Sequence, residues 1–291
     1  MKTITVNGNS FPNFTLESNN NSNSPIHFTG ANGFPAGVYT SFLNRFNQYY
    51  SISAADCRGA LETRSSPPKH FGLSRFADDL IDIIEATHSE PVIAMGHSFG
   101  AHVSLIAAIK RPDLIKQLVL IEPASLPNPW VDLIYLKLPT SVVNRIMPLI
   151  SRTQQRQRIW RDHDSFVSRY RSHPTFKHLT EQAMRAYAEH GLKERKDGQY
   201  ELVFDPDWEA HIFRNICFVW KNLKKTKTPT LFIRAKHSNL YSSKMFHSQN
   251  AKLGEHFTGV EVANTYHLMP LESPEACAKT ALEWLSKHNE H

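Results

Sequence analysis

The chain has 291 residues, 41% of them hydrophobic and 21% charged, a composition typical of a globular protein with a substantial core. Its formal charge is +6, but no run of Lys and Arg is interleaved with aromatic residues, so we expect no nucleic-acid partner. No segment has the apolar length of a bilayer span, and the first residues lack the apolar stretch of a signal peptide, so we expect no membrane association.

Segments of strand and helix character alternate through the first part of the chain. Apolar runs that end at Gly, Pro or Asp predict strands followed by loops, and apolar residues at a spacing of three and four predict helices. The expected order is strand (25–35), strand (49–59), helix (76–88), strand (91–95), helix (101–112) and strand (117–123).

The pattern changes from residue 128 to residue 227, which is rich in Arg, His, Trp and Tyr and contains amphipathic helical stretches such as 176–192. Strand character returns at 228–237 and 259–267, and the chain closes with a helical segment at 274–288. This alternation predicts an α/β fold with a mostly parallel sheet. We expect a core made of 1–127 and 228–291, with a helical cap, 128–227, inserted after the sixth strand.

A candidate nucleophile lies in the sequence Gly96-His97-Ser98-Phe99-Gly100, which has the pattern G-x-S-x-G. The pattern follows a strand-like run and opens a helix-like run, as a nucleophile elbow requires. Glycine on either side of the serine removes Cβ atoms where strand and helix approach closely, and the start of a helix favours developing negative charge. Ser98 is therefore the predicted nucleophile.

Four segments together resemble the α/β-hydrolase family, in its branch with a helical cap. They are 32–35 (NGFP), 56–59 (DCRG), 96–100 (GHSFG) and 267–274 (HLMPLESP), which stand in the order and at the spacings of that family. The resemblance covers nearly the whole chain. It implies the α/β-hydrolase fold and a serine hydrolase that needs no metal and no organic cofactor.

His267 is the predicted general base. A hydroxyl is a poor nucleophile until an imidazole takes its proton, and the order nucleophile, acid, histidine places the base last in the chain. The family carries its catalytic histidine in a loop like the one at His267, before a helix that begins at a Ser-Pro pair. The neighbouring His97 is expected to point away from the elbow and, like His102, to have a structural role.

The acid is the less regular member of the predicted triad. In the family an Asp usually follows the strand that here reads 228–237, but this chain has Asn239 at that place. Some relatives place a glutamate one strand earlier, which corresponds to Glu122. We favour Glu122 as the acid, with Asn239 as an additional contact behind the base. If neither supports His267, the chain would be a weakened or non-catalytic relative.

The resemblance also implies an oxyanion hole made of two backbone amides. One belongs to Phe99, which follows the nucleophile, and the other to Phe34 in the 32–35 segment, where the family often reads His-Gly-x-Pro. The presence of Asn32 in place of that histidine leaves the backbone donor in place. Asp56 and Arg58 are expected to support the fold.

The predicted cap carries 18 Lys and Arg against 11 Asp and Glu. Its clustered arginines either hold an acidic group of a small-molecule substrate or form a solvated helix face; they are Arg152, Arg156, Arg158, Arg161, Arg169 and Arg171. Its large aromatic residues either line an apolar pocket or anchor the cap; they are Trp130, Trp160, Phe166, Tyr170 and Trp208.

Three functions fit these patterns. The leading prediction is hydrolysis of a carboxylic ester or thioester through an acyl-Ser98 intermediate. The alternatives are carbon–carbon bond hydrolysis of a diketone-type acid, and ligand binding without catalysis on a hydrolase scaffold. The cysteines Cys57, Cys217 and Cys277 are odd in number and lack metal-ligand spacing, which predicts free thiols in a cytoplasmic protein. The oligomeric state stays open.

Overall fold

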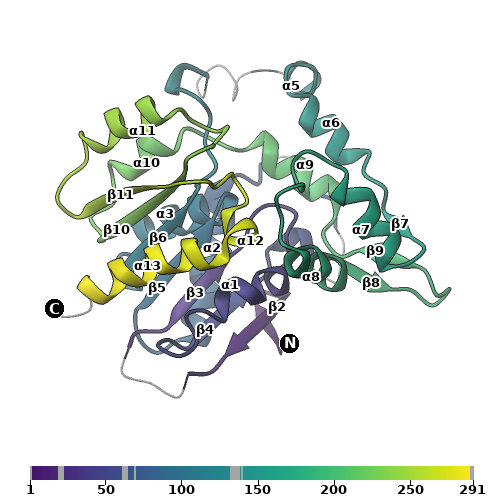
Figure 1. Ribbon diagram of the computed structural model, residues 1–291, viewed down its shortest axis with the longest axis horizontal. Helices are drawn as coiled ribbons and strands as arrows, with labels where there is room; N and C mark the ends of the chain where they lie inside the picture. The colour runs from purple at the N-terminus through teal and green to yellow at the C-terminus, as the bar shows by residue number, and fades with distance from the viewer. Residues whose placement is uncertain are drawn as a thin grey trace.

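The computed structural model describes residues 2–18, 23–60, 65–68, 70–131, 138 and 140–288. An eight-stranded sheet with the order β1-β2-β4-β3-β5-β6-β10-β11 forms its centre (Figure 1). The strands are β1 (Lys2–Val6), β2 (Asn9–Leu16), β3 (Ile26–Thr29), β4 (Ile52–Ala55), β5 (Val92–His97), β6 (Ile115–Ile121), β10 (Thr230–Ala235) and β11 (Phe257–Val262).

Among the described strands of this sheet, the neighbours β4–β3, β3–β5, β5–β6, β6–β10 and β10–β11 pair in parallel, and β1–β2 and β2–β4 pair antiparallel. Every residue of β3, β4, β5 and β10 is buried. Their mostly apolar sequences are typical of a parallel sheet, which is covered on both faces. The predicted α/β-hydrolase fold, a mostly parallel sheet flanked by helices, is confirmed.

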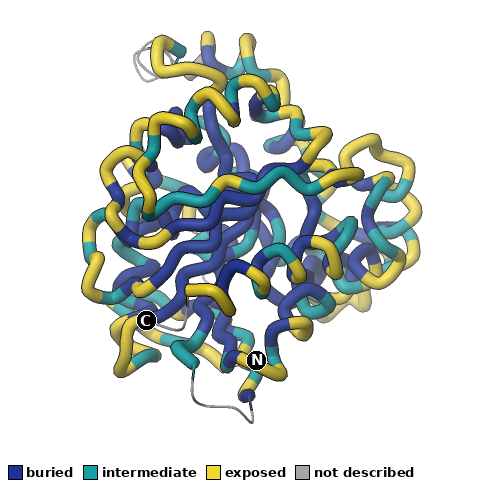
Figure 2. The backbone as a smooth tube through the Cα atoms, turned by 60° about the vertical axis from the view of Figure 1, so that its left-hand side comes forward, coloured by how far each residue is buried: buried dark blue, intermediate teal, exposed yellow. Residues whose placement is uncertain are grey.

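Alternate residues of the central strands enter two separate cores, because successive side chains of a strand point to opposite faces. Met95 and Ile121 pack on the face that carries α1 (Thr40–Leu43) and α13 (Pro274–His288). Ala94 and Leu120 pack on the other face, which carries α2 (Leu73–Thr87) and α3 (Phe99–Lys110). The buried strands therefore form one continuous dark band through the molecule in Figure 2.

The remaining core elements are short. They are the 3₁₀ turns η1 (Ala36–Tyr39) and η2 (Arg58–Ala60), α11 (Ser243–Asn250), which contacts β11, and α12 (Met269–Glu272), which leads into α13. Among the described residues, no helix is long and apolar enough to span a membrane.

Between β6 and β10 the chain leaves the sheet and forms the β6–β10 connection, residues 122–229, at the upper and right side of Figure 1. Its elements are α5 (Thr140–Ile146), α6 (Pro148–Gln154), β7 (Ile159–Trp160), α7 (His163–Arg171), α8 (Glu181–Gly191), β8 (Leu192–Glu194), β9 (Tyr200–Leu202), α9 (Pro206–Arg214) and α10 (Val219–Leu223). The strands form a small antiparallel sheet of order β7-β9-β8. The insertion follows the sixth strand, as the sequence predicted.

Candidate active site

Ser98 lies on a tight turn between β5 and α3, with a left-handed backbone conformation (φ 54°, ψ −114°). Steric constraints explain the glycines on either side of Ser98. A Cβ on Gly100 would lie 2.1 Å from the carbonyl oxygen of Thr29, and one on Gly96 would lie 2.5 Å from the amide nitrogen of Ala101. The turn therefore needs glycine at both positions, because β3, β5 and α3 meet there with no room for a side chain.

Three side chains from distant parts of the chain form a hydrogen-bonded series. The Nε2 atom of His267 lies 2.9 Å from Ser98 Oγ, and its Nδ1 atom lies 3.2 Å from Glu122 Oε2. A carboxylate only accepts, so the imidazole donates from Nδ1 and leaves Nε2 free to accept the serine hydroxyl. This is the arrangement that lets an imidazole remove a proton from a serine.

Glu122 is fully buried at the end of β6, also in a left-handed conformation (φ 46°). A buried carboxylate needs several donors to offset the loss of water. Besides His267, the amide of Ala235 donates to Oε1 at 2.7 Å and the hydroxyl of Ser238 donates to Oε2 at 2.8 Å. The strand end of β10, where the sequence has no acid, thus supplies two donors to the acid of the neighbouring strand.

The sequence suggested that Asn239 contacts the site behind the base. In the structure Asn239 is exposed, and among the described residues it makes no hydrogen bond to His267 or Glu122. Its neighbour Ser238 makes the contact to the acid. The bend after β10 turns the serine side chain toward the acid, whereas Asn239 is exposed, and the contact expected of Asn239 stays a prediction.

The loop that carries His267 is fixed by a residue that the sequence reasoning missed. Both carboxylate oxygens of Glu272 accept backbone amides on either side of the base, from Tyr266 at 2.9 Å and from Leu268 at 3.2 Å. Burial raises the pKa of Glu272, and these two hydrogen bonds counteract part of the shift. One pattern in the sequence could have identified Glu272: it is a Glu five residues after a loop histidine, at the end of a short helical turn.

The two amides predicted for the oxyanion hole have different surroundings. Phe99 is the first residue of α3, where helix geometry leaves the amide without a partner in the helix. The Phe34 amide donates to the carbonyl oxygen of Ala31 at 3.1 Å and closes a tight turn, the Ala31–Phe34 turn. Gly33 sits in this turn with φ 84°, a conformation that favours glycine.

The Ala31–Phe34 turn is backed by a buried polar cluster from the β6–β10 connection. Arg156 pairs with Glu209 and donates to the hydroxyl of Tyr187 at 2.9 Å. The Phe34 ring stacks on Tyr187 with ring centres 4.7 Å apart. A Cβ on Gly33 would lie 2.9 Å from the Glu209 carboxylate. The connection therefore contacts the predicted oxyanion residues directly.

The arginines of the connection mostly face carboxylates of the protein itself. Arg156 pairs with Glu209, Arg158 with Asp205 and Asp207, Arg161 with Asp162, and Arg171 with Glu181. Arg152 and Arg169 are exposed and have no ion pair with another described residue. Of the aromatic residues, Trp160, Phe166 and Trp208 are buried in the two cores. Tyr170 packs against the core that contains Met95 and Ile121, and Trp130 is 74% exposed.

Asp56 and Arg58 lie behind the site and tie its loops together. Asp56 accepts the amide of Ala36 at 2.6 Å, just after the Ala31–Phe34 turn. Arg58 forms two hydrogen bonds of 2.6 Å to the carboxylate of Asp79 in α2. Burial raises the pKa of Asp56 to about 7, and the Ala36 hydrogen bond lowers it in part.

The chain belongs to the alpha/beta hydrolase family, whose profile matches residues 26–280. Its fold is similar to that of E-2-(acetamidomethylene)succinate hydrolase, with a TM-score of 0.81 and 20% identity over 98% of both chains. The thioesterase domain from the curacin biosynthetic pathway gives a TM-score of 0.72 with 19% identity, over 97% of this chain and 98% of that one. At these identities the likeness shows the fold.

A curated relative is the RutD protein of Agrobacterium fabrum, whose name describes it as a candidate carbamate hydrolase. It is 33% identical to this chain over 87 residues. The match covers 30% of this chain and 33% of that protein, so the chain spans about a third of the relative's length.

Proposed function

We propose that this protein hydrolyses a carboxylic ester or thioester through an acyl-Ser98 intermediate, with His267 as general base and Glu122 as the acid of the triad. The observation that carries the proposal is the series Ser98–His267–Glu122, with separations of 2.9 and 3.2 Å. Membership of the alpha/beta hydrolase family supports the reaction class.

In the first half of the reaction, Ser98 Oγ attacks the carbonyl carbon of the substrate while its proton moves to His267 Nε2. The carbonyl π electrons move onto oxygen, which becomes the oxyanion of a tetrahedral intermediate. The bond to the leaving group then breaks, and the imidazolium returns the proton to the departing alcohol or thiol. The acyl group stays on Ser98.

In the second half, His267 Nε2 takes a proton from water, and the resulting hydroxide equivalent attacks the acyl carbon. The second tetrahedral intermediate collapses, Ser98 Oγ leaves with the proton from the imidazolium, and the carboxylic acid is released. The Glu122 carboxylate stabilises the imidazolium that forms twice per turnover. Its donors Ala235 and Ser238 hold the carboxylate in place for this purpose.

The oxyanion would be bound by the amides of Phe99 and Phe34. Since the Phe34 amide donates to Ala31 in the structure, we propose that its hydrogen is shared between that carbonyl and the substrate oxygen, as in a three-centre hydrogen bond. One such donor typically contributes about 3 kcal/mol to the stability of the transition state.

The substrate side of the proposal rests on the β6–β10 connection acting as a cap. We propose a small-molecule substrate in the cytoplasm. If the substrate carries an acidic group, we propose Arg152 and Arg169 as the residues that bind it, because both are exposed and have no carboxylate partner among the described residues. The names of similar proteins mention a thioesterase, a succinate derivative and a carbamate. A thioester and a carbamate each carry a carbonyl carbon, which fits a serine nucleophile.

A fluorophosphonate probe tests the proposal, because it forms a covalent bond only with an activated serine. We expect rapid labelling of the wild type and none of Ser98→Ala. A substitution of the exposed Ser286 by Ala serves as a matched control that keeps full labelling. Folded wild type that takes no label would overturn the proposal in favour of ligand binding without catalysis.

A substrate panel then separates the reaction types. Esters and thioesters of short acids, with and without a second carboxylate, are compared with an amide, a carbamate and a diketone-type acid. We expect the highest kcat/KM with an ester or thioester. Turnover of the diketone-type acid alone would replace the proposal by carbon–carbon bond hydrolysis.

A further inference from the structure

Tyr39 and His97 form a buried hydrogen-bonded pair that the proposed mechanism does not use. The hydroxyl of Tyr39 lies 2.8 Å from His97 Nδ1. On one side, the amide of Ala31 donates to the Tyr39 hydroxyl at 3.0 Å. On the other side, His97 Nε2 lies 2.8 Å from the carbonyl oxygen of His267. The pair therefore connects the turn of the predicted oxyanion hole with the backbone of the predicted base.

The direction of each hydrogen bond follows from the atoms at the two ends. A carbonyl oxygen only accepts, so His97 carries its proton on Nε2 and donates to His267. The neutral ring then accepts at Nδ1, and the Tyr39 hydroxyl donates there while it accepts from Ala31. Burial, reinforced by the nearby His267, lowers the pKa of His97 to about 3, which keeps the ring neutral. The donor and the acceptor of each of these hydrogen bonds are therefore fixed by the atoms present.

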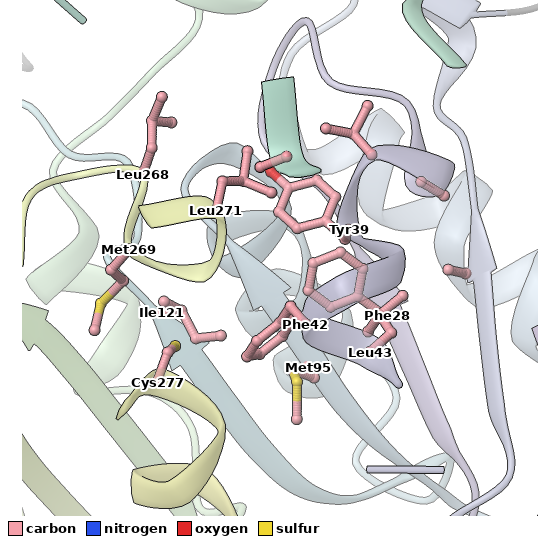
Figure 3. Close-up of a cluster of buried hydrophobic side chains, with 14 of the residues drawn as sticks. Phe28, Tyr39, Phe42, Leu43, Met95, Ile121, Leu268, Met269, Leu271 and Cys277 are labelled. Carbon is pink, nitrogen blue, oxygen red and sulfur yellow. The ribbon is translucent and has the colours of Figure 1, made fainter. Parts of the chain in front are cut away.

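The surroundings hold both rings rigidly. Tyr39 and His97 are fully buried, and the Tyr39 ring packs against Phe28 with ring centres 4.8 Å apart. In Figure 3 the Tyr39 ring lies beside Phe28, and its hydroxyl points away from Phe28 and Phe42. The only polar group of the ring is therefore directed toward the loops of the site.

We propose that Tyr39 and His97 are positioning residues that set the distance between the oxyanion turn and the general base. The proposal rests on the proposed function. Ala31 is held at both polar atoms, since its amide donates to Tyr39 and its carbonyl accepts the Phe34 amide. Four hydrogen bonds thus run without a break from the Phe34 amide to the carbonyl of His267.

The physical reason for such a connection lies in the geometry of acyl transfer. The base must reach Ser98 Oγ while the oxyanion donors face the carbonyl oxygen, and a misplacement of about 1 Å costs about 100-fold in rate. The two loops come from opposite ends of the chain, and the triad itself holds only the side chain of His267. The pair holds its backbone in relation to the oxyanion turn.

The test uses substitutions that each break one or two hydrogen bonds of the series, and Tyr39→Phe breaks those to Ala31 and His97. Tyr39→Phe removes the hydroxyl. His97→Gln keeps a donor near the Nε2 position and loses the acceptor for Tyr39, whereas His97→Asn keeps an acceptor near Nδ1 and loses the donor to His267. His27→Gln is the matched control, because His27 is a fully buried histidine of the neighbouring strand whose Nδ1 atom lies 2.8 Å from the Ser53 hydroxyl.

The measurements are kcat and KM for a p-nitrophenyl ester, expressed per site titrated with the fluorophosphonate probe, so that unfolded protein does not count. We expect kcat to fall about 10- to 100-fold in the three variants at the pair, with KM within about twofold of wild type. The double variant Tyr39→Phe with His97→Gln should be no slower than the slower single variant, because both break the same hydrogen bond.

Two results would overturn the inference and can be told apart. If the wild type turns over ester and takes the probe while the variants keep its kcat, or lose no more than His27→Gln does, the positioning role fails and the proposed function stands. If the folded wild type takes no probe, the proposed function fails and the positioning role with it.

Discussion

The hydroxyl of Ser238 donates to Glu122 Oε2 at 2.8 Å, so the loop after β10 supports an acid that stands at the end of β6. The two strands are neighbours in the sheet and pair in parallel, which brings their carboxyl ends together. The same carboxylate oxygen faces His267. An acid on either strand end can thus reach the same imidazole, and this chain carries the acid on β6 with its donors on β10.

Replacement of the acid is the most direct test of this arrangement. In Glu122→Gln the imidazole loses the negative charge that stabilises its protonated form, and the side chain keeps its size. We expect kcat to fall by about 10³- to 10⁴-fold, as for the equivalent change in serine proteases. The measurement is ester turnover, with circular dichroism to show that the variant is folded.

Two neighbouring substitutions serve as controls for the acid. Ser238→Ala removes one of the donors to the carboxylate, and we expect a loss of about 10- to 100-fold, the size of one hydrogen bond to a charged group. Asn239→Ala should leave kcat within about twofold, because its side chain is exposed. Equal activity of Glu122→Gln and wild type would show that another group acts as the acid.

The sheet and the elbow could be predicted because their signals are local. The continuous apolar runs of β5, β6 and β10 mark buried parallel strands, and the elbow needs Gly96 and Gly100 at fixed places beside Ser98. Family resemblance supplied the order of the triad. These features depend on short stretches of sequence that can be recognised without knowing which segments touch.

The supporting contacts could not be predicted, because each joins residues that are distant in sequence. The residues adjacent to Tyr39 in sequence do not indicate that its hydroxyl contacts His97. In the same way, the residues adjacent to Arg156 do not indicate that it pairs with Glu209. An arginine-rich segment looks the same whether it faces a substrate or its own carboxylates. The contact of Ser238 with Glu122 could not be predicted for a similar reason, since the direction of a loop side chain depends on the bend after the strand.

Gly100, two residues after Ser98, is expected to be irreplaceable. In Gly100→Ala the added Cβ would lie 2.1 Å from Thr29 O and 2.5 Å from Gly30 O, both backbone atoms that cannot rotate away. We expect a loss of about 3 kcal/mol or more in the free energy of unfolding, measured by urea denaturation. Gly72→Ala is the control, because its Cβ would meet only Asn215 Oδ1 at 3.7 Å. Similar stability of the two variants would contradict the close packing of β3 and α3.

The Arg156–Glu209 pair is expected to matter far more than the exposed pairs around it. The two side chains are 15% and 9% exposed, so Glu209→Gln leaves a buried guanidinium without a compensating charge. We expect a loss of about 3–5 kcal/mol in the free energy of unfolding. In the exposed pair Arg171–Glu181, Glu181→Gln should cost less than about 1 kcal/mol. A double variant, Arg156→Met with Glu209→Leu, should regain part of the loss, and a further loss would contradict this account.

Asp56 is expected to make the stability of the protein fall as the pH rises. Burial raises its folded-state pKa to about 7 from an ordinary value of 3.8, so between these values the folded state holds a proton that the unfolded state has lost. Its contribution is fully present below the unfolded pKa and is lost as the pH rises through 7.

At about 1.4 kcal/mol per pKa unit, the loss between pH 5 and pH 8 is on the order of 3 kcal/mol. Asp56→Asn keeps an acceptor for the Ala36 amide and has no charge to bury, so its stability relative to wild type should increase by about this amount over the same range. Urea denaturation at pH 5, 6.5 and 8 measures the difference, with the exposed Asp164→Asn as control. A constant difference across the three pH values would mean that Asp56 is already ionised in the folded protein at pH 5, with its charge matched by the Ala36 amide.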